Sequence, residues 1–201
     1  MAEERPPLVG GDVVLDLVNT VAWRLTPGRC IERIPTAEAL LDWLARLQVV
    51  DGPVAEAMRT AASADPTAAG TAVERVRRLR ENVYRVLLAV IDRRAPADAD
   101  THALRAEMVD ALAGAELTSV VPLRWAVRPV GLSDLPAVLA LEVWRFFQFT
   151  DLTRVRQCAD QDCGWLFLDA SRNASRRWCS SADCGNRARA RRHYQRAAGR
   201  R

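Results

Sequence analysis

The stretch CADQDCGWLFLDASRNASRRWCSSADC, residues 158–184, decides the fold of the C-terminal part of the chain. It contains two cysteine pairs, each with four intervening residues, separated by a gap of fifteen residues. Two such pairs joined by a loop can supply the four tetrahedral thiolates that zinc prefers, with no coordination position left open. We therefore predict a structural zinc ion, with an iron–sulfur cluster or disulfides as the alternatives. The predicted ligands are Cys158, Cys163, Cys179 and Cys184.

The segments around the pairs indicate how the ligands are carried. The apolar run 165–168 predicts a strand, and the turn-rich run after it predicts a hairpin that begins at the first pair. The second pair is expected at the start of a final helix, residues 182–197. Cys30 lies far from both pairs in the sequence, and we expect it to be a small buried hydrophobic residue.

Charge is distributed unevenly along the 201 residues. All 29 basic residues are arginines, a bias that a GC-rich genome largely explains. Residues 1–150 hold 17 arginines against 20 acidic residues, a net charge of −3, whereas residues 151–201 hold 12 arginines against five aspartates, a net charge of +7. This step predicts two domains: an acidic body, residues 1–150, and a basic zinc module, residues 151–201.

The predicted final helix separates its arginines into two sets. At 100° per residue, Arg189, Arg192 and Arg196 form one stripe. Guanidinium groups bind phosphate in bidentate fashion, so we expect this stripe, together with Arg191, to bind nucleic acid. A solvated charged face in an arginine-rich protein is the alternative.

Other arginines are expected to support the zinc site. A zinc ion with four thiolates carries a formal charge of −2, which nearby guanidinium groups can offset while they fix the loop carbonyls. Arg187 lies on the helix side opposite the stripe, three positions after the last cysteine, Cys184. The residues predicted for this role are Arg187, Arg176 and Arg177.

The body is predicted to be mainly helical, with a small β element. Apolar residues at helical spacing predict helices that begin after Thr36, over residues 71–93, after Pro96 (burying Leu104, Met108 and Leu112) and over residues 134–149. The run DPTAAGT, residues 65–71, predicts a loop, and alternation over residues 121–128 predicts a strand. Residues 12–24 are apolar throughout, so their period does not separate strand from helix. The fold class is therefore α+β and helix-dominated, with a treble-clef-like or ribbon-like zinc module at the C-terminus.

Polar residues within the first apolar run are candidates for a small-molecule pocket. They are Asp16, Asn19, Thr20 and Trp23. An enzyme built around them would need a nucleophile or a base, yet the histidines are His102, on a predicted helix, and His193, in the basic tail. We therefore predict no catalytic residues and no enzyme activity.

Two motifs resemble a known family. Residues 184–187 read CGNR, and with LFLDASRNASRRWC before them they resemble the CGNR zinc-finger family. The N-terminal run DLVNTVAWR, residues 16–24, is similar to the opening of the domain that precedes this finger in the family. Members are described as stress-induced transcription regulators with a zinc-dependent DNA-binding tail. The resemblance thus implies a bacterial-type transcription regulator that binds duplex DNA.

The residues by themselves leave other functions open. A small zinc module can also bind RNA or a protein, and phosphate contacts alone do not distinguish the nucleic acids. The body is expected to sense a small-molecule effector or to form a homodimer, through the helix at 134–149 or the helix at 71–93. The N-terminus has no secretory pattern and no segment is apolar enough to cross a bilayer, so we expect a cytoplasmic protein without a membrane partner.

Overall fold

The structure is a computed structural model that describes residues 6–198, and these residues group into two compact units. Unit 1 contains Pro6 and residues 33–150, and unit 2 contains residues 7–32 together with residues 151–198. The charge step at residue 150 coincides with a boundary between the units. Grouping residues 1–32 with the acidic body, by contrast, differs from the contacts, which assign residues 7–32 to the unit of the cysteine pairs.

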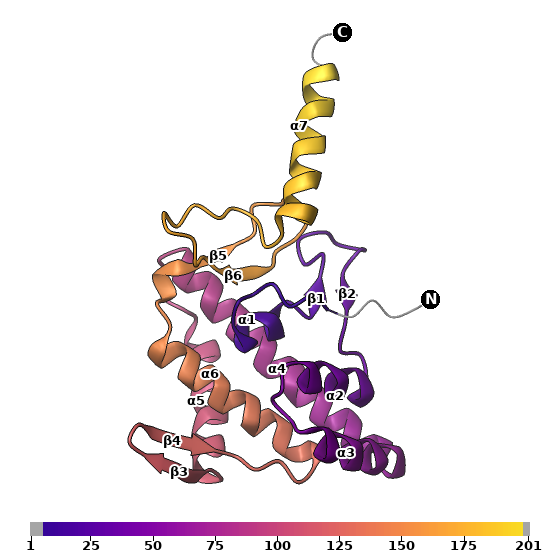
Figure 1. Cartoon of the computed structure of the whole chain (residues 1–201), viewed down its shortest axis with the longest axis vertical. Coiled ribbons are helices and arrows are strands. Elements are labelled where there is room, and N and C mark those ends of the chain that lie inside the picture. Colours follow the sequence, from indigo (N-terminus) through magenta and orange to yellow (C-terminus); the bar gives the residue numbers. More distant parts are fainter. Residues whose placement is uncertain (1–5, 199–201) are drawn as a thin grey trace. The chain divides into compact units, whose positions relative to one another are not determined.

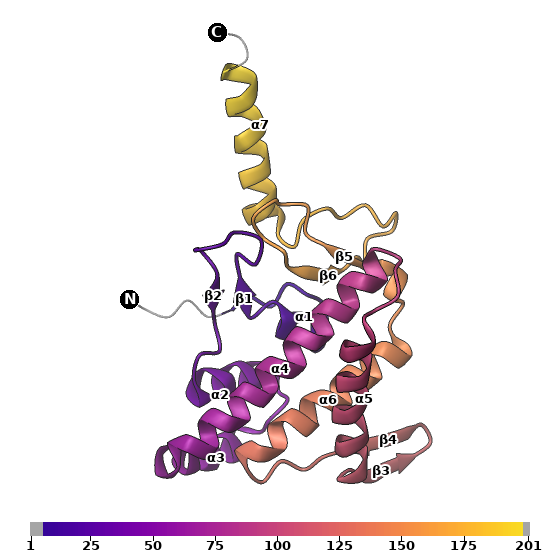
Figure 2. The same cartoon turned by 180° about the vertical axis from the view of Figure 1, so that it is seen from behind.

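Unit 1 is built mainly from helices. In chain order its elements are α2 (Ala37–Arg46), α3 (Gly52–Ala64), α4 (Pro66–Ile91), α5 (Asp98–Ala113), β3 (Glu116–Val120), β4 (Leu123–Ala126), a 3-10 turn (Leu132–Asp134) and α6 (Leu135–Phe149). The long helix α4 packs against α5 and α6, and α2 and α3 pack on one another and on α4 (Figures 1 and 2). The expected alternation over residues 121–128 corresponds to β4 of an antiparallel hairpin with β3.

Helix α6 forms part of the core of unit 1. It buries apolar side chains on several sides, among them Leu135, Leu139, Val143 and Phe146. Helix α5 buries Leu104 as expected, but Met108 and Leu112 are only half-buried, and the small residue Ala111 lies in the core instead.

The loop predicted over residues 65–71 is wrong. Helix α3 ends at Ala64 and α4 begins at Pro66, so a single residue separates them. The Asp65 carboxylate accepts a hydrogen bond from the Ala68 amide at 2.9 Å, and proline is tolerated at the first helical position because its missing N–H would be unpaired there. The same residues that suggested a turn therefore start a helix. Thr36 caps α2 in the same way, as predicted, by accepting from the Ala39 amide at 3.2 Å.

Unit 2 combines the N-terminal segment with the cysteine-containing region. Its elements are α1 (Val13–Val18), β1 (Val21–Ala22), β2 (Ile31–Glu32), a 3-10 turn (Leu152–Arg154), β5 (Val155–Gln157), β6 (Leu166–Leu168), a π turn (Ser181–Gly185) and α7 (Asn186–Ala198). The ambiguous run 12–24 thus contains both a helix and a strand. Strands β5 and β6 pair antiparallel on either side of the first cysteine pair. The helix-dominated α+β class is confirmed.

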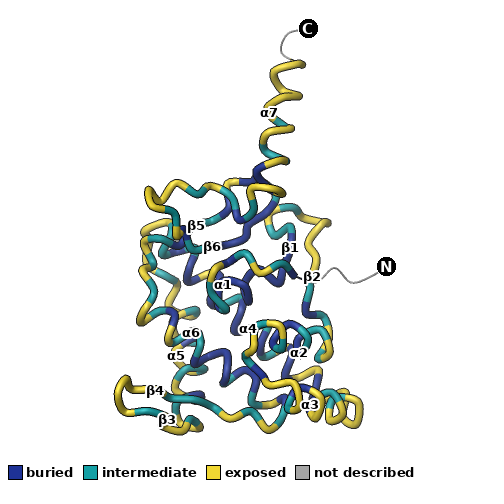
Figure 3. Tube along the Cα trace, viewed as in Figure 1, coloured by how far each residue is buried: buried dark blue, intermediate teal, exposed yellow. Residues whose placement is uncertain are grey.

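Backbone and side-chain hydrogen bonds fix the N-terminal segment to β6 and its neighbours. The Asn19 side chain donates to the Leu166 carbonyl at 2.8 Å and accepts from the Leu166 amide at 2.9 Å. Trp165 Nε1 donates to the Val21 carbonyl at 2.7 Å, and the Leu168 amide donates to the Gly10 carbonyl at 2.8 Å. These contacts join positions separated by more than 140 residues, and Figure 3 shows the buried course of α1 and β6.

Gly164 permits a further close approach between the N-terminal segment and the first cysteine turn. Its φ of +75° lies in the left-handed region, and an added Cβ would be 2.9 Å from the Arg24 Cβ. A larger residue at position 164 would therefore be strained twice, once in the backbone and once by the N-terminal segment. Among the described residues, 6–198, no helix combines the length and apolarity that crossing a bilayer requires.

Candidate metal centre and nucleic-acid interface

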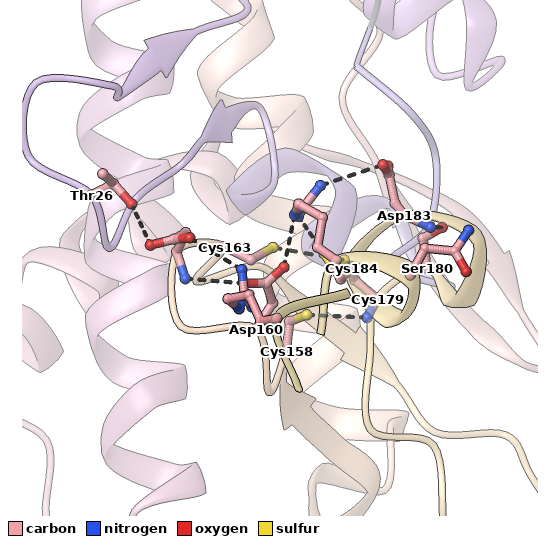
Figure 4. Close-up of polar contacts among 12 residues, drawn as sticks. Thr26, Cys158, Asp160, Cys163, Cys179, Ser180, Asp183 and Cys184 are labelled. Carbon is pink, nitrogen blue, oxygen red and sulfur yellow. Dashed lines mark hydrogen bonds and ion pairs between the residues drawn. The ribbon is translucent and has the colours of Figure 1, made fainter. Parts of the chain in front are cut away.

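Four cysteines of unit 2 gather in one buried cluster. Their Sγ atoms all lie within 4.8 Å of one another, and each residue is at most 5% exposed. Cys158 and Cys163 lie in the turn between β5 and β6, Cys179 follows the loop after β6, and Cys184 lies in the π turn before α7 (Figure 4). The helix start predicted at the second pair is present. The predicted hairpin is wrong: strand β6 pairs with β5, which precedes the first cysteine pair, and not with the segment that follows the turn-rich run.

The donor set fits a zinc ion. All four residues are free thiols rather than two disulfides, and soft thiolates in a closed tetrahedral set are typical of structural zinc. Hydrogen bonds among the four sulfurs raise the pKa of the Cys179 thiol and lower the pKa of the Cys158 thiol. Four thiolates within 4.8 Å of one another would repel, and a bound cation would offset this repulsion. When bound, zinc would link the two halves of unit 2's cysteine region through four strong bonds.

The cluster is supported by short backbone contacts. The Cys158 amide donates to the Trp165 carbonyl at 2.8 Å, and the Cys163 amide donates to the Asp160 carbonyl at 3.1 Å. The Cys179 amide points at the Cys158 sulfur, 3.4 Å away, which favours the thiolate form. The chain itself therefore links the first ligand turn to the second ligand pair, and a bound metal would add to this link.

Asp160 connects the first cysteine turn to α7. Its side chain is fully buried, and its two oxygens accept from Arg187 Nε at 2.9 Å and from Arg191 Nη2 at 2.6 Å. Burial opposes ionisation of this carboxyl, but the hydrogen bonds from Arg191, the Asp162 amide and Arg187 outweigh it and lower its pKa. Sequence reasoning missed this residue. The available signal was an acid between two metal ligands in a module whose other charges are mostly arginines.

Arg187 lies where an offsetting positive charge was expected. Its Nη2 is 2.9 Å from the Cys184 Sγ, and its guanidinium lies 4.6 Å from the centroid of the Trp23 ring. Burial lowers the pKa of Arg187, but the charges of Cys184 and Asp160 raise it by more, so the group is firmly cationic. It can therefore reduce the negative charge of a metal–thiolate cluster directly at one sulfur.

The two neighbouring arginines before Cys179 behave differently. Arg176 donates to the carbonyls of Trp178, Cys179 and Val9, and its guanidinium covers the Phe167 ring at 4.3 Å. It thus fixes loop carbonyls around the cluster, which is part of the predicted role. Arg177 has an exposed side chain that lies over the Trp178 ring, 5.4 Å from its centroid, and no contact with a ligand sulfur is present.

The arginines of α7 fall into an exposed and a packed set. Arg189, Arg192 and Arg196 are exposed, and within residues 6–198 none of them pairs with a carboxylate. Arg189 donates to Asn186 Oδ1 and the Ser181 carbonyl, and Arg192 to the Ala188 carbonyl. Arg191, which the sequence grouped with nucleic-acid contacts, is half-buried and donates to Asp160 and, at 3.4 Å, to Asp162.

The residues predicted to line a pocket are buried or half-buried and make contacts within unit 2. Asp16 accepts from the Gly10 amide at 2.8 Å, and the Thr20 hydroxyl donates to the Leu17 carbonyl at 2.8 Å. Asn19 pairs with β6, and Trp23 packs against the cysteine cluster, with Arg29 4.0 Å from its ring centroid. These polar groups serve the chain's own backbone. Cys30, expected to be buried, is exposed in the loop before β2, where no core surrounds it.

The fold and the four-cysteine cluster define a zinc-finger protein with an additional helical unit. Residues 154–197 match the model of the CGNR zinc finger, and residues 11–157 match the family described as "Putative stress-induced transcription regulator". The second match covers well over half of the chain, so the chain belongs to this family. A comparison with curated proteins gives no match. The resemblance drawn from CGNR and DLVNTVAWR is confirmed, as is zinc as the cofactor, and the family is one of regulators rather than enzymes.

Proposed function

We propose that the chain is a DNA-binding transcription regulator and that α7 contacts the phosphates of duplex DNA. The observation that carries the proposal is the stripe of Arg189, Arg192 and Arg196. All three are exposed, and none has a carboxylate partner within the described residues. Family membership supports regulation, and the uncompensated charge supports a polyanionic partner.

The start of α7 is fixed in a way that suits this role. Asp160 holds Arg187 and Arg191 on the packed side, so the helix cannot rotate freely about its axis relative to the cysteine turn. The exposed stripe then keeps a constant orientation on unit 2. Held side chains lose less entropy on binding than side chains on a freely moving tail, which favours affinity.

Replacement of each stripe residue by alanine tests the proposal. Each of Arg189→Ala, Arg192→Ala and Arg196→Ala should lower the slope of log Kobs against log salt by about one unit, because each removes about one phosphate contact. Zinc content should stay the same. Arg78→Ala is the matched control, since Arg78 is an exposed arginine on α4 of unit 1. Unchanged slopes for all three variants would contradict the proposal, and a clear preference for RNA over duplex DNA would move the chain to the RNA-binding alternative.

We also propose that unit 1 senses a small molecule and pairs with a second copy. A surface groove of about 630 Å³ lies between the N-terminus of α2 and the junction of α3 and α4, lined largely by small side chains such as Ala62, Ala69 and Val73.

The β3–β4 hairpin exposes Val120 and Val121, at 70% and 89%. Helices α4 and α6 bury their apolar faces within unit 1, so the hairpin replaces them as the proposed contact. Sedimentation at high concentration tests the pairing, and a monomer under all conditions would end it.

A further inference from the structure

The loop that leads into Cys179 carries an exposed arginine, Arg177, and a half-buried tryptophan, Trp178, close to the start of α7. Trp178 is half-buried, and its inner part packs on the cluster of cysteines. Gly185 lies against it: a Cβ added there would be 3.5 Å from Trp178 Cε3 and 3.5 Å from Arg189 Nη1. Trp178 and Arg189 therefore both lie within contact distance of Gly185, immediately before the first residue of α7.

Arg177 lies on this tryptophan. Its guanidinium carbon is 5.4 Å from the centroid of the indole ring, and its carbonyl accepts from the Ala159 amide at 2.9 Å. The backbone of Arg177 is thus fixed on the first cysteine turn. Its side chain is exposed, and among residues 6–198 no carboxylate pairs with it.

The adjacent Arg176, by contrast, is half-buried. Arg176 spends its donors on the carbonyls of Trp178, Cys179 and Val9. Arg177 faces solvent with its N–H groups unused by those carbonyls. Of these two consecutive arginines, Arg176 stabilises the loop through hydrogen bonds, and Arg177 exposes its positive charge to solvent.

We infer that Arg177 is a further phosphate contact of the DNA interface, placed by Trp178 near the α7 stripe. The inference rests on the proposed function of α7. A guanidinium held against an aromatic ring keeps its in-plane N–H donors free, so it can bind a phosphate in bidentate fashion while the ring limits its rotation. The interface then has two arms, the loop before Cys179 and the helix after Cys184, both fixed by the same metal cluster.

Salt-dependent binding of the full-length, zinc-loaded protein to one short DNA duplex tests this inference. Arg177→Ala should lower the salt slope by about one unit, as loss of one phosphate contact does. Arg177→Lys should retain most of the slope, because the positive charge remains. It should bind DNA more weakly than the unchanged protein, because an ammonium lacks the paired N–H donors of the guanidinium. Zinc content and the helical circular dichroism signal should stay unchanged in both variants.

Two reference variants separate the possible failures. If Arg189→Ala lowers the slope and Arg177→Ala does not, the proposed function stands and this inference is overturned. If neither Arg177→Ala nor any of the three stripe variants lowers the slope, both fail. A loss of zinc in Arg177→Ala would assign the residue to the metal site and overturn the inference. An equal drop of the salt slope in Arg78→Ala would show that the slope reports only net charge, which also overturns it. So does an Arg177→Ala effect seen with RNA and not with duplex DNA.

Discussion

Arg187 connects three parts of unit 2 that lie far apart in the sequence. Its guanidinium donates to the Cys184 sulfur at 2.9 Å and to the buried Asp160 carboxylate, also at 2.9 Å, and it lies over the Trp23 ring. A charge-assisted hydrogen bond at a ligand sulfur lowers the electron density that the metal must accept from that thiolate. The residue is therefore a support of the metal site, although it belongs to the same arginine run as the stripe.

Replacement of Arg187 should weaken zinc binding. We expect Arg187→Ala to reduce zinc affinity about 10- to 100-fold, the usual range for loss of a group that supports metal ligands. Arg187→Lys should recover only part of this, because one ammonium cannot reach Cys184, Asp160 and Trp23 together. The measurement is competition for zinc against a chelating indicator.

Arg189→Ala serves as the control for this experiment. Arg189 lies on the same helix, two residues later, but it is exposed and contacts no cysteine. It should bind zinc as tightly as the unchanged protein. Equal losses in Arg187→Ala and Arg189→Ala would show that the helix as a whole, and not the contact with Cys184, supports the metal.

At the residue scale, the sequence predicted ligands better than it predicted their neighbours. Paired cysteines are recognisable because short loops fix the distance between ligands of one pair. The role of Asp160 as the partner of two α7 arginines was not recognisable, because it depends on α7 lying against the first cysteine turn in the folded chain. Arg191 was assigned to nucleic acid in addition to the stripe, although helical phase places it on the side of Arg187. The acids that it contacts, Asp160 and Asp162, lie about thirty positions earlier.

At the scale of elements, Asp65 separates two helices that the sequence had divided by a loop. Its side chain accepts from the Ala68 amide at 2.9 Å and so pairs one of the free N–H groups at the start of α4. Turn-forming residues such as Asp and Pro also begin helices, and composition does not distinguish the two uses. Amphipathic helices such as α2 were predictable because one apolar face recurs along them.

Asp65→Ala should destabilise unit 1. Loss of an N-cap side chain costs about 1 kcal/mol, so the free energy of unfolding should fall by about that amount. Asp51→Ala is the matched control, because Asp51 precedes α3 but makes no side-chain capping hydrogen bond. Denaturant unfolding followed by circular dichroism measures both. A loss of equal size at Asp51 would show that charge near the helix start, rather than the hydrogen bond, stabilises α4.

At the scale of the whole molecule, the N-terminal segment belongs to the same compact unit as the cysteine cluster, although the helices of unit 1 lie between them in the sequence. Asn19 pairs with Leu166, and the Trp165 indole donates to the Val21 carbonyl. Composition and period report local structure, whereas these contacts depend on segments more than 140 positions apart, so no window of sequence could predict them. The family match over residues 11–157 likewise includes residues of both units.

Zinc removal should therefore release residues 7–32 together with residues 151–198. Metal binding and folding are coupled in small zinc units, and the N-terminal segment is hydrogen-bonded to β6 and its neighbours within the same unit. We expect amide hydrogen exchange in α1 and β6 to accelerate together after chelation, while α4 and α6 stay protected by the separate core of unit 1. Cys163→Ser should reproduce the pattern without a chelator, and Cys30→Ser should not, because Cys30 lies outside the cluster. Continued protection of α1 in the zinc-free protein, with β6 exchanging freely, would show that the N-terminal segment folds independently of the metal centre.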